Sequence, residues 1–152
     1  CRPCLPVLSS QAWGSKMKIT VCGSLKFLEK MKEIEKMLVL QGHSVLLPQR
    51  FEGTDYDNKT IADGIRNITS HNAIREHYKK ILQSDAILVT NYDKKGIVNY
   101  IGGNTFLEMG LAYVNNKKIF VLNSPPTEGI NYLEEILGMQ PLILNGNLSQ
   151  IR

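Results

Sequence analysis

Five short apolar runs, each separated from the next by a longer polar or amphipathic stretch, constrain the fold of this chain most strongly. They occupy residues 18–22, 44–48, 86–90, 118–122 and 141–144. Strands that are apolar at consecutive positions are buried on both faces, which is typical of parallel sheets covered by helices. Apolar side chains recur at helical spacing in the intervening residues 26–40, 71–82, 104–114 and 132–137. We therefore predict an α/β domain with a five-stranded, parallel, doubly wound sheet of the flavodoxin or Rossmann type, with helices on both faces.

The connection between the second and third runs is unusually long and polar. Residues 49–70 contain several acidic and amide side chains and two glycines. A connection of this length in a small domain is commonly functional. We expect an irregular crossover or mobile lid, with one short helix near residues 61–65.

Length and composition indicate one domain and exclude several functions. The chain has 152 residues, of which we assign 17–152 to the domain and 1–16 to a flexible upstream extension or cloning remnant. Cys1 and Cys4 form a Cys-x-x-Cys pair with no second pair to complete a zinc site, and three cysteines in all suit a reducing cytoplasm. A net charge of +4 without an arginine-rich block argues against nucleic acid as a partner. No apolar run is long enough for a membrane span, so we expect no membrane partner.

Residues 99–112, Asn-Tyr-Ile-Gly-Gly-Asn-Thr-Phe-Leu-Glu-Met-Gly-Leu-Ala, are the segment most indicative of chemistry. Gly102 and Gly103 predict a loop that takes positive φ and lets a ligand approach the backbone closely. A helix follows, and Glu108 is expected in its first turn, where the helix dipole favours the ionised carboxylate. Glu108 is therefore a candidate catalytic residue.

A purely structural interpretation of the same segment stays open. Asn104 and Thr105 are typical helix-start residues, and Thr105 with Glu108 fits a capping box, in which both side chains bond to backbone N–H groups of the first turn. Spacing alone does not separate a capping role for Glu108 from a catalytic one.

The segment from Gly103 to Ala112 resembles the Gly-Thr-x-x-Glu-x-Gly-x-Ala segment of the nucleoside 2-deoxyribosyltransferase-like family, which includes 2′-deoxynucleoside 5′-phosphate N-hydrolases. Weaker similarity extends over residues 17–144. The resemblance implies that Glu108 is a nucleophile that attacks the anomeric carbon of a deoxyribose. It also implies an enzyme without a cofactor that forms a homo-oligomer.

The chain departs from that family at two acidic positions. An Asp that the family carries on the helix before the third strand falls here at His77, beside Glu76. Either of these residues takes over its role, or the substrate differs from a plain deoxynucleoside. The transferases also carry an Asp six residues before the nucleophile, where this chain has Gly102, so hydrolysis is favoured over transfer.

Further candidates lie at the ends of the first and third apolar runs. If these two strands flank the point where strand order reverses, Gly23 and Ser24 meet the loop that begins at Asn91. Ser24 suits a 5′-oxygen or phosphate, or else a simple turn. Asp93 could contact a ribose hydroxyl or serve only as a turn residue, and Tyr100 could stack on a base or only cover the core.

The common nucleotide motifs are missing from the chain. Gly-Ser-Leu-Lys follows the first run, so neither Gly-x-Gly-x-x-Gly nor a P-loop lysine is present. His43 is expected at the surface, and the three histidines are too dispersed in the sequence to predict a metal site. We therefore expect N-glycosidic cleavage or deoxyribosyl transfer on a nucleoside or nucleoside 5′-monophosphate. The alternative is a non-catalytic nucleotide-binding or sensing module on the same fold.

Overall fold

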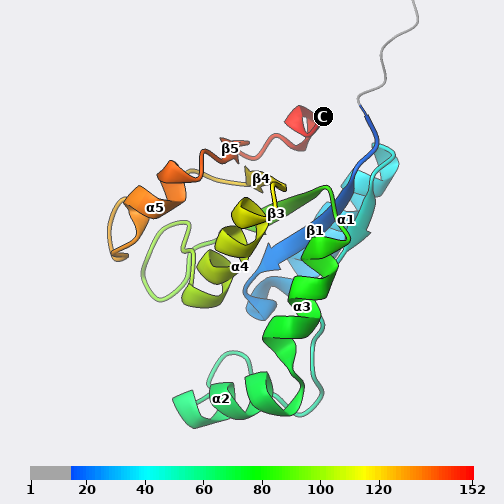
Figure 1. Ribbon diagram of the computed structural model, residues 1–152. Coiled ribbons are helices and arrows are strands. Elements are labelled where there is room, and N and C mark those ends of the chain that lie inside the picture. The colour runs from blue at the N-terminus through cyan, green and yellow to red at the C-terminus, as the bar shows by residue number, and fades with distance from the viewer. Residues whose placement is uncertain (1–14) are drawn as a thin grey trace, which may run out of the picture.

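The computed structural model describes residues 15–152 and confirms the expected α/β architecture (Figure 1). All strand pairs are parallel, and the sheet order is β2-β1-β3-β4-β5. The strands are β1 (Lys18–Gly23), β2 (Ser44–Leu46), β3 (Ala86–Thr90), β4 (Lys118–Val121) and β5 (Leu142–Ile143). Strand order reverses between β1 and β3, as the sequence predicted, so their carboxyl ends define the expected ligand-binding edge.

Helices cover both faces of this sheet. They are α1 (Leu28–Leu40), α2 (Ile61–Ser70), α3 (Ala73–Leu82), α4 (Gly103–Val114) and α5 (Leu133–Gly138), with short 3₁₀ turns at η1 (Leu25–Phe27) and η2 (Leu148–Gln150). Buried side chains of α1 and of the C-terminal segment pack on one face of the sheet. Those of α3, α4 and α5 pack on the other face (Figure 1).

Strand alternation decides which side chains reach each face. In β1, Val21 packs with Met31 of α1, whereas Cys22 lies in the opposite layer with Ile81 of α3 and Met109 of α4. Cys22 is fully buried, as expected. Its thiol is therefore turned toward the two helices that border the ligand-binding edge.

The long connection holds more helix than the sequence predicted. In place of one short helix near residues 61–65, α2 runs for ten residues, and Thr60 and Asp63 form a capping box at its start. None of its residues is buried, and its contacts are with α3. Figure 1 shows α2 beyond the end of the sheet rather than against either face.

The start of α4 differs from the predicted capping box. The helix begins at Gly103 with Gly102 as its cap at φ −82°, and no side chain caps it. The alternative interpretation of Thr105 and Glu108 as a capping box therefore does not hold, because both residues lie inside the helix. Glu108 is in the second turn rather than the first, so its side chain is free of the cap amides. The positive φ angles predicted for Gly102 and Gly103 occur instead earlier in the loop, at Lys95, Gly96 and Asn99.

Two other expectations concern the N-terminal part of the chain. His43 is buried rather than at the surface, because its Nδ1 accepts a hydrogen bond of 3.1 Å from the backbone N–H of Met17. Cys1 and Cys4, with most of the predicted extension, lie outside the described residues. Within residues 15–152, none of the helices has both the length and the apolar character needed to cross a bilayer.

Candidate active site

A cavity of about 310 Å³ opens at the carboxyl ends of β1 and β3. Its walls come from the end of β1, from α3, from the β3–α4 loop with the start of α4, and from the connection before α2. The structure brings most of the predicted site residues together here: Gly23, Ser24, Glu76, His77, Tyr100, Gly102, Gly103, Asn104, Thr105 and Glu108. A Cβ at Gly23 would collide with the Thr90 hydroxyl, so the close approach of β1 and β3 requires glycine there.

One half-buried and two buried side chains lie at the bottom of this cavity or directly behind it, and we call Cys22, His77 and Glu108 the floor cluster. They come from β1, α3 and α4 respectively. The Cys22 Sγ lies 3.5 Å from His77 Nε2, and His77 Nε2 lies 3.7 Å from Glu108 Oε1. The His77 and Glu108 side chains are 9% and 20% exposed, so the carboxyl reaches the cavity while most of it is shielded from water. The sequence indicated Cys22 only as a buried thiol, because its contact with His77 spans 55 residues.

Burial shifts all three floor groups toward their uncharged forms. It raises the pKa of Glu108 to about 8, against a smaller lowering by the Cys22 thiol hydrogen bond. Burial and the nearby Lys80 lower the pKa of His77 to about 4, and a hydrogen bond to the Val21 backbone opposes them. Burial first, and then Glu108, raise the pKa of the Cys22 thiol. His77 is therefore neutral at pH 7, and its contact with Glu108 is not an ion pair.

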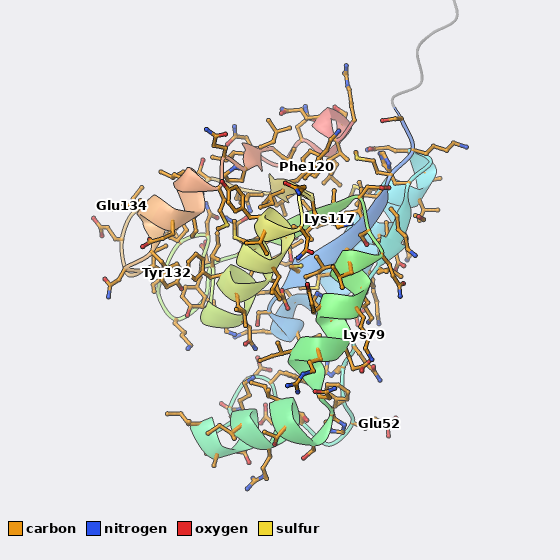
Figure 2. All side chains as sticks on the ribbon, in the orientation of Figure 1. Glu52, Lys79, Lys117, Phe120, Tyr132 and Glu134 are labelled. Carbon is orange, nitrogen blue, oxygen red and sulfur yellow. The ribbon has the colours of Figure 1, made fainter. Side chains whose placement is uncertain are left out.

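Glu76 lines the cavity but differs from Glu108 in its surroundings. Its carboxylate pairs with Lys79 Nζ at 2.8 Å, and its side chain is 49% exposed. Figure 2 shows Lys79 on the outward side of α3. Glu76 is thus held toward solvent at the rim, whereas Glu108 lies at the floor.

Positive charge gathers around Lys94 in the wall of the cavity. Lys94 Nζ donates a 2.7 Å hydrogen bond to Ser24 Oγ, which joins the β3–α4 loop to the end of β1. Burial, and then Lys95, Lys59 and Lys26, lower the pKa of Lys94. These lysines repel one another, so a bound anion would relieve the repulsion. The sequence does not single out Lys94, because one lysine in a loop forms no distinguishing pattern.

Aromatic side chains provide the other surfaces of the cavity. Tyr100 lines it together with Phe51, Tyr56 and Tyr92. Tyr100 is packed so closely over Gly102 that a Cβ there would lie 3.2 Å from its ring. Behind this loop, Tyr132 stacks on Phe106 of α4 with ring centroids 4.5 Å apart. The Tyr100 ring therefore lines the cavity, and the residue that caps α5 packs behind the loop that carries Tyr100.

Two predicted site residues do not line the cavity. Asn91 is buried, and its amide bonds to the backbone of Asn123 at the end of β4, donating at 2.8 Å and accepting at 2.9 Å. The Asp93 carboxylate accepts the backbone N–H of Asn99 at 2.9 Å. Both residues thus hold the loops in place, and neither enters the function proposed below.

The chain was compared with known proteins. A 2-deoxyribosyltransferase from the psychrotolerant bacterium Bacillus psychrosaccharolyticus aligns with a TM-score of 0.50 and 19% identity, over 76% of this chain and 78% of that chain. CMP N-glycosidase BcmB of Clostridium botulinum gives a TM-score of 0.49 and 16% identity, over 84% and 89%. A conserved protein from Enterococcus faecalis V583 gives 0.45 and 16%, over 83% and 75%.

Sequence comparison is less informative, because no protein-family model and no curated protein matches the chain. At such low identities the structural similarity shows the fold. It confirms the predicted 2-deoxyribosyltransferase-like architecture. The 2-deoxyribosyltransferase that shares it is described as a biocatalyst for the synthesis of nucleosides.

Proposed function

We propose that the chain cleaves the N-glycosidic bond of a nucleoside 5′-monophosphate, with Glu108 as the nucleophile. The observation that carries the proposal is a mostly buried carboxyl group exposed only to a cavity at the reversal point of the sheet. The fold shared with a 2-deoxyribosyltransferase adds support. The chain thus has the fold of such an enzyme together with a shielded carboxyl group that faces the cavity, where the sugar of the substrate would bind.

The cavity offers a partner for each part of such a substrate. Lys94 and Ser24 suit the 5′-phosphate, because an ammonium and a hydroxyl can both donate to phosphate oxygens. Tyr100 and Phe51 suit the base, since aromatic rings stack on it whatever its identity. With the phosphate and base held in this way, the sugar lies over Glu108.

The reaction balances with water as the only second substrate. The reaction uses the ionised form of Glu108, whose share grows as the pH rises toward its pKa of about 8. An oxygen of this carboxylate bonds to C1′ while the bond between C1′ and the base nitrogen breaks, giving a glycosyl ester. Water then hydrolyses the ester, so that its hydroxyl stays on C1′, its proton goes to the released base, and the Glu108 carboxylate is regenerated. His77, neutral and 3.7 Å away, orients the carboxyl without repelling the positive charge that develops at C1′.

One observation favours the alternative of a non-catalytic nucleotide-binding module. Among the described residues that line the cavity, Glu76 is the only carboxylate besides Glu108, and it is paired with Lys79. Glycosidases ordinarily use two carboxyl groups. A binding module would need neither.

The decisive experiment is a chromatographic assay of base release. A panel of ribo- and 2′-deoxynucleosides with their 5′-monophosphates is incubated with wild-type protein, E108Q and the matched control E76Q. We expect release from a monophosphate by wild type and E76Q, and a loss of at least roughly 10³-fold in kcat for E108Q. Thermal stabilisation by nucleotides without base release would favour the binding module. Release by folded E108Q at the wild-type rate would refute the nucleophile.

A further inference from the structure

The floor cluster combines three side chains of metal-binding type. Cys22 Sγ, His77 Nε2 and a Glu108 carboxylate oxygen all lie within 4.8 Å of one another. We propose that these three residues bind one Zn²⁺ ion, whose fourth coordination position faces the cavity.

The distances are close to those of a zinc centre before any movement. With Zn–S, Zn–N and Zn–O bonds of about 2.0–2.3 Å in a tetrahedron, neighbouring ligand atoms lie about 3.4–3.6 Å apart. The Sγ–Nε2 distance is 3.5 Å and the Nε2–Oε1 distance is 3.7 Å. The third edge, between Cys22 Sγ and a Glu108 carboxylate oxygen, is no longer than 4.8 Å.

The chemistry of the set selects zinc over the commoner hard ions. A thiolate and an imidazole suit Zn²⁺, whereas Mg²⁺ and Ca²⁺ prefer oxygen ligands alone. The Cys22 thiolate and the Glu108 carboxylate together neutralise the two charges of the ion. Binding breaks the S–H bond of Cys22 and the O–H bond of protonated Glu108 and releases both protons to solvent, with no change in oxidation state.

The surroundings hold the ligands but leave an opening. The three residues lie on β1, α3 and α4, whose buried side chains pack together in one layer of the core. His77 and Glu108 line the cavity whereas Cys22 is wholly buried behind them, so water or a ligand can reach the metal from the cavity side.

One cation acts against the metal. Lys80 is near enough to His77 to lower its pKa, but its ammonium donates a 2.8 Å hydrogen bond to the Leu47 carbonyl. That bond fixes the ammonium at the backbone of Leu47, just after the end of β2. The remaining repulsion weakens zinc binding without occupying the coordination position.

The zinc site shares Glu108 with the function proposed above, so metal and sugar compete for one carboxylate. Zinc binding itself requires no turnover. A protein that binds zinc but never releases base would contradict the proposed function and leave this inference standing. A protein that releases base but does not bind zinc would contradict this inference and leave the proposed function standing.

Calorimetric titration of the full chain tests the site directly, after metal is stripped with EDTA and the chelator is removed. ZnCl₂ is titrated into wild type, C22A and E108Q, with the double variant C1S/C4S and the variant H71A as controls. We expect one equivalent of zinc in wild type and both controls, and binding at least about tenfold weaker in C22A and in E108Q. Should C22A not fold by circular dichroism, E108Q decides the outcome.

Cobalt spectroscopy provides the second measurement. Co²⁺ in the same proteins should give the strong visible bands of four-coordinate cobalt and a thiolate-to-metal charge-transfer band that C22A lacks. The inference is overturned by absence of saturable zinc binding, by unchanged binding in E108Q, or by loss of binding in C1S/C4S.

Discussion

The floor and the roof of the cavity are built in opposite ways. The floor cluster sits on elements buried in the core, and its three side chains contact one another across β1, α3 and α4. The roof, which we define as residues 49–70, contributes Phe51, Tyr56 and Lys59 to the cavity, and its helix α2 buries no residue. We therefore expect the floor to carry the chemistry that depends on fixed distances. We expect the roof to admit the ligand and to adapt its conformation to it.

Occupying the floor with metal should have the largest effect. Zinc bound to Glu108 removes the nucleophile, so at a free concentration of one hundred times Kd only about 1% of the protein stays metal-free. We expect base release to fall about a hundredfold and to return on addition of EDTA. The assay is base release against buffered free zinc, with C22A as the matched control that resists inhibition. Zinc that binds stoichiometrically without slowing the reaction would show that floor and sugar site are separate.

Lysines from the two regions should differ in their effect on substrate binding. Lys94 is anchored to Ser24 in the body of the domain, whereas Lys59 belongs to the roof. A charge-assisted hydrogen bond is worth about 1.5–3 kcal/mol, so K94A should raise KM for a 5′-monophosphate about tenfold to a hundredfold.

The matched variant K59A should raise that KM less than about threefold, because a surface charge contributes little. Neither change should affect KM for a substrate without phosphate. Steady-state kinetics on paired nucleoside and monophosphate substrates measures both. Equal effects of K94A on the two substrates would contradict phosphate binding at Lys94.

The buried carboxyl of the floor should cost stability as it ionises. Its folded-state pKa of about 8 lies above its ordinary 4.5, so the folded protein holds the proton more tightly than the unfolded chain. Stability contributed by this proton is therefore lost as pH rises from 4.5 to 8.

E108Q removes that loss. In metal-free buffer its free energy of unfolding should exceed that of wild type by on the order of 1–3 kcal/mol at pH 8.5, and by little at pH 4.5. Urea denaturation at both pH values measures the difference. A difference between E108Q and wild type that stays constant with pH would mean that the Glu108 carboxyl is well solvated.

The smallest effect is expected in the roof. Thr60 caps α2 and bonds to Asp63, so T60A should destabilise that helix by about 1 kcal/mol. Because α2 adds no buried residue, global unfolding should barely change. Hydrogen exchange would show faster exchange in α2 alone, with S149A as a surface control. Slower exchange in α2, or a matching loss of global stability, would show that roof and floor unfold together.

The sequence predicted the sheet more reliably than the site. Buried parallel strands are continuous apolar runs, so residues 86–90 were identified to the residue as β3. The start of α4 was misassigned because Thr105 and Glu108 have capping-box spacing, whereas the backbone uses Gly102, which has no side chain to reveal it. His77 and Cys22 are 55 residues apart, and only the packing of α3 on β1 brings them together.

Polar loop residues were the least predictable. Asn91 follows a strand at the ligand-binding edge, as a site residue would, but its amide ties the ends of β3 and β4 together. The sequence around Lys94 is equally ordinary, but the hydrogen bond to Ser24 places the Lys94 side chain in the wall of the cavity. Local pattern cannot distinguish the two cases, because each depends on a partner from another part of the chain.

The most direct test of the account is a crystal structure of metal-free E108Q bound to a nucleoside 5′-monophosphate. We predict that the phosphate contacts Lys94 and Ser24, and that C1′ lies about 3–3.5 Å from the substituted side chain at position 108. A nucleotide whose sugar lies away from position 108, or whose phosphate occupies the floor, would contradict the proposed chemistry.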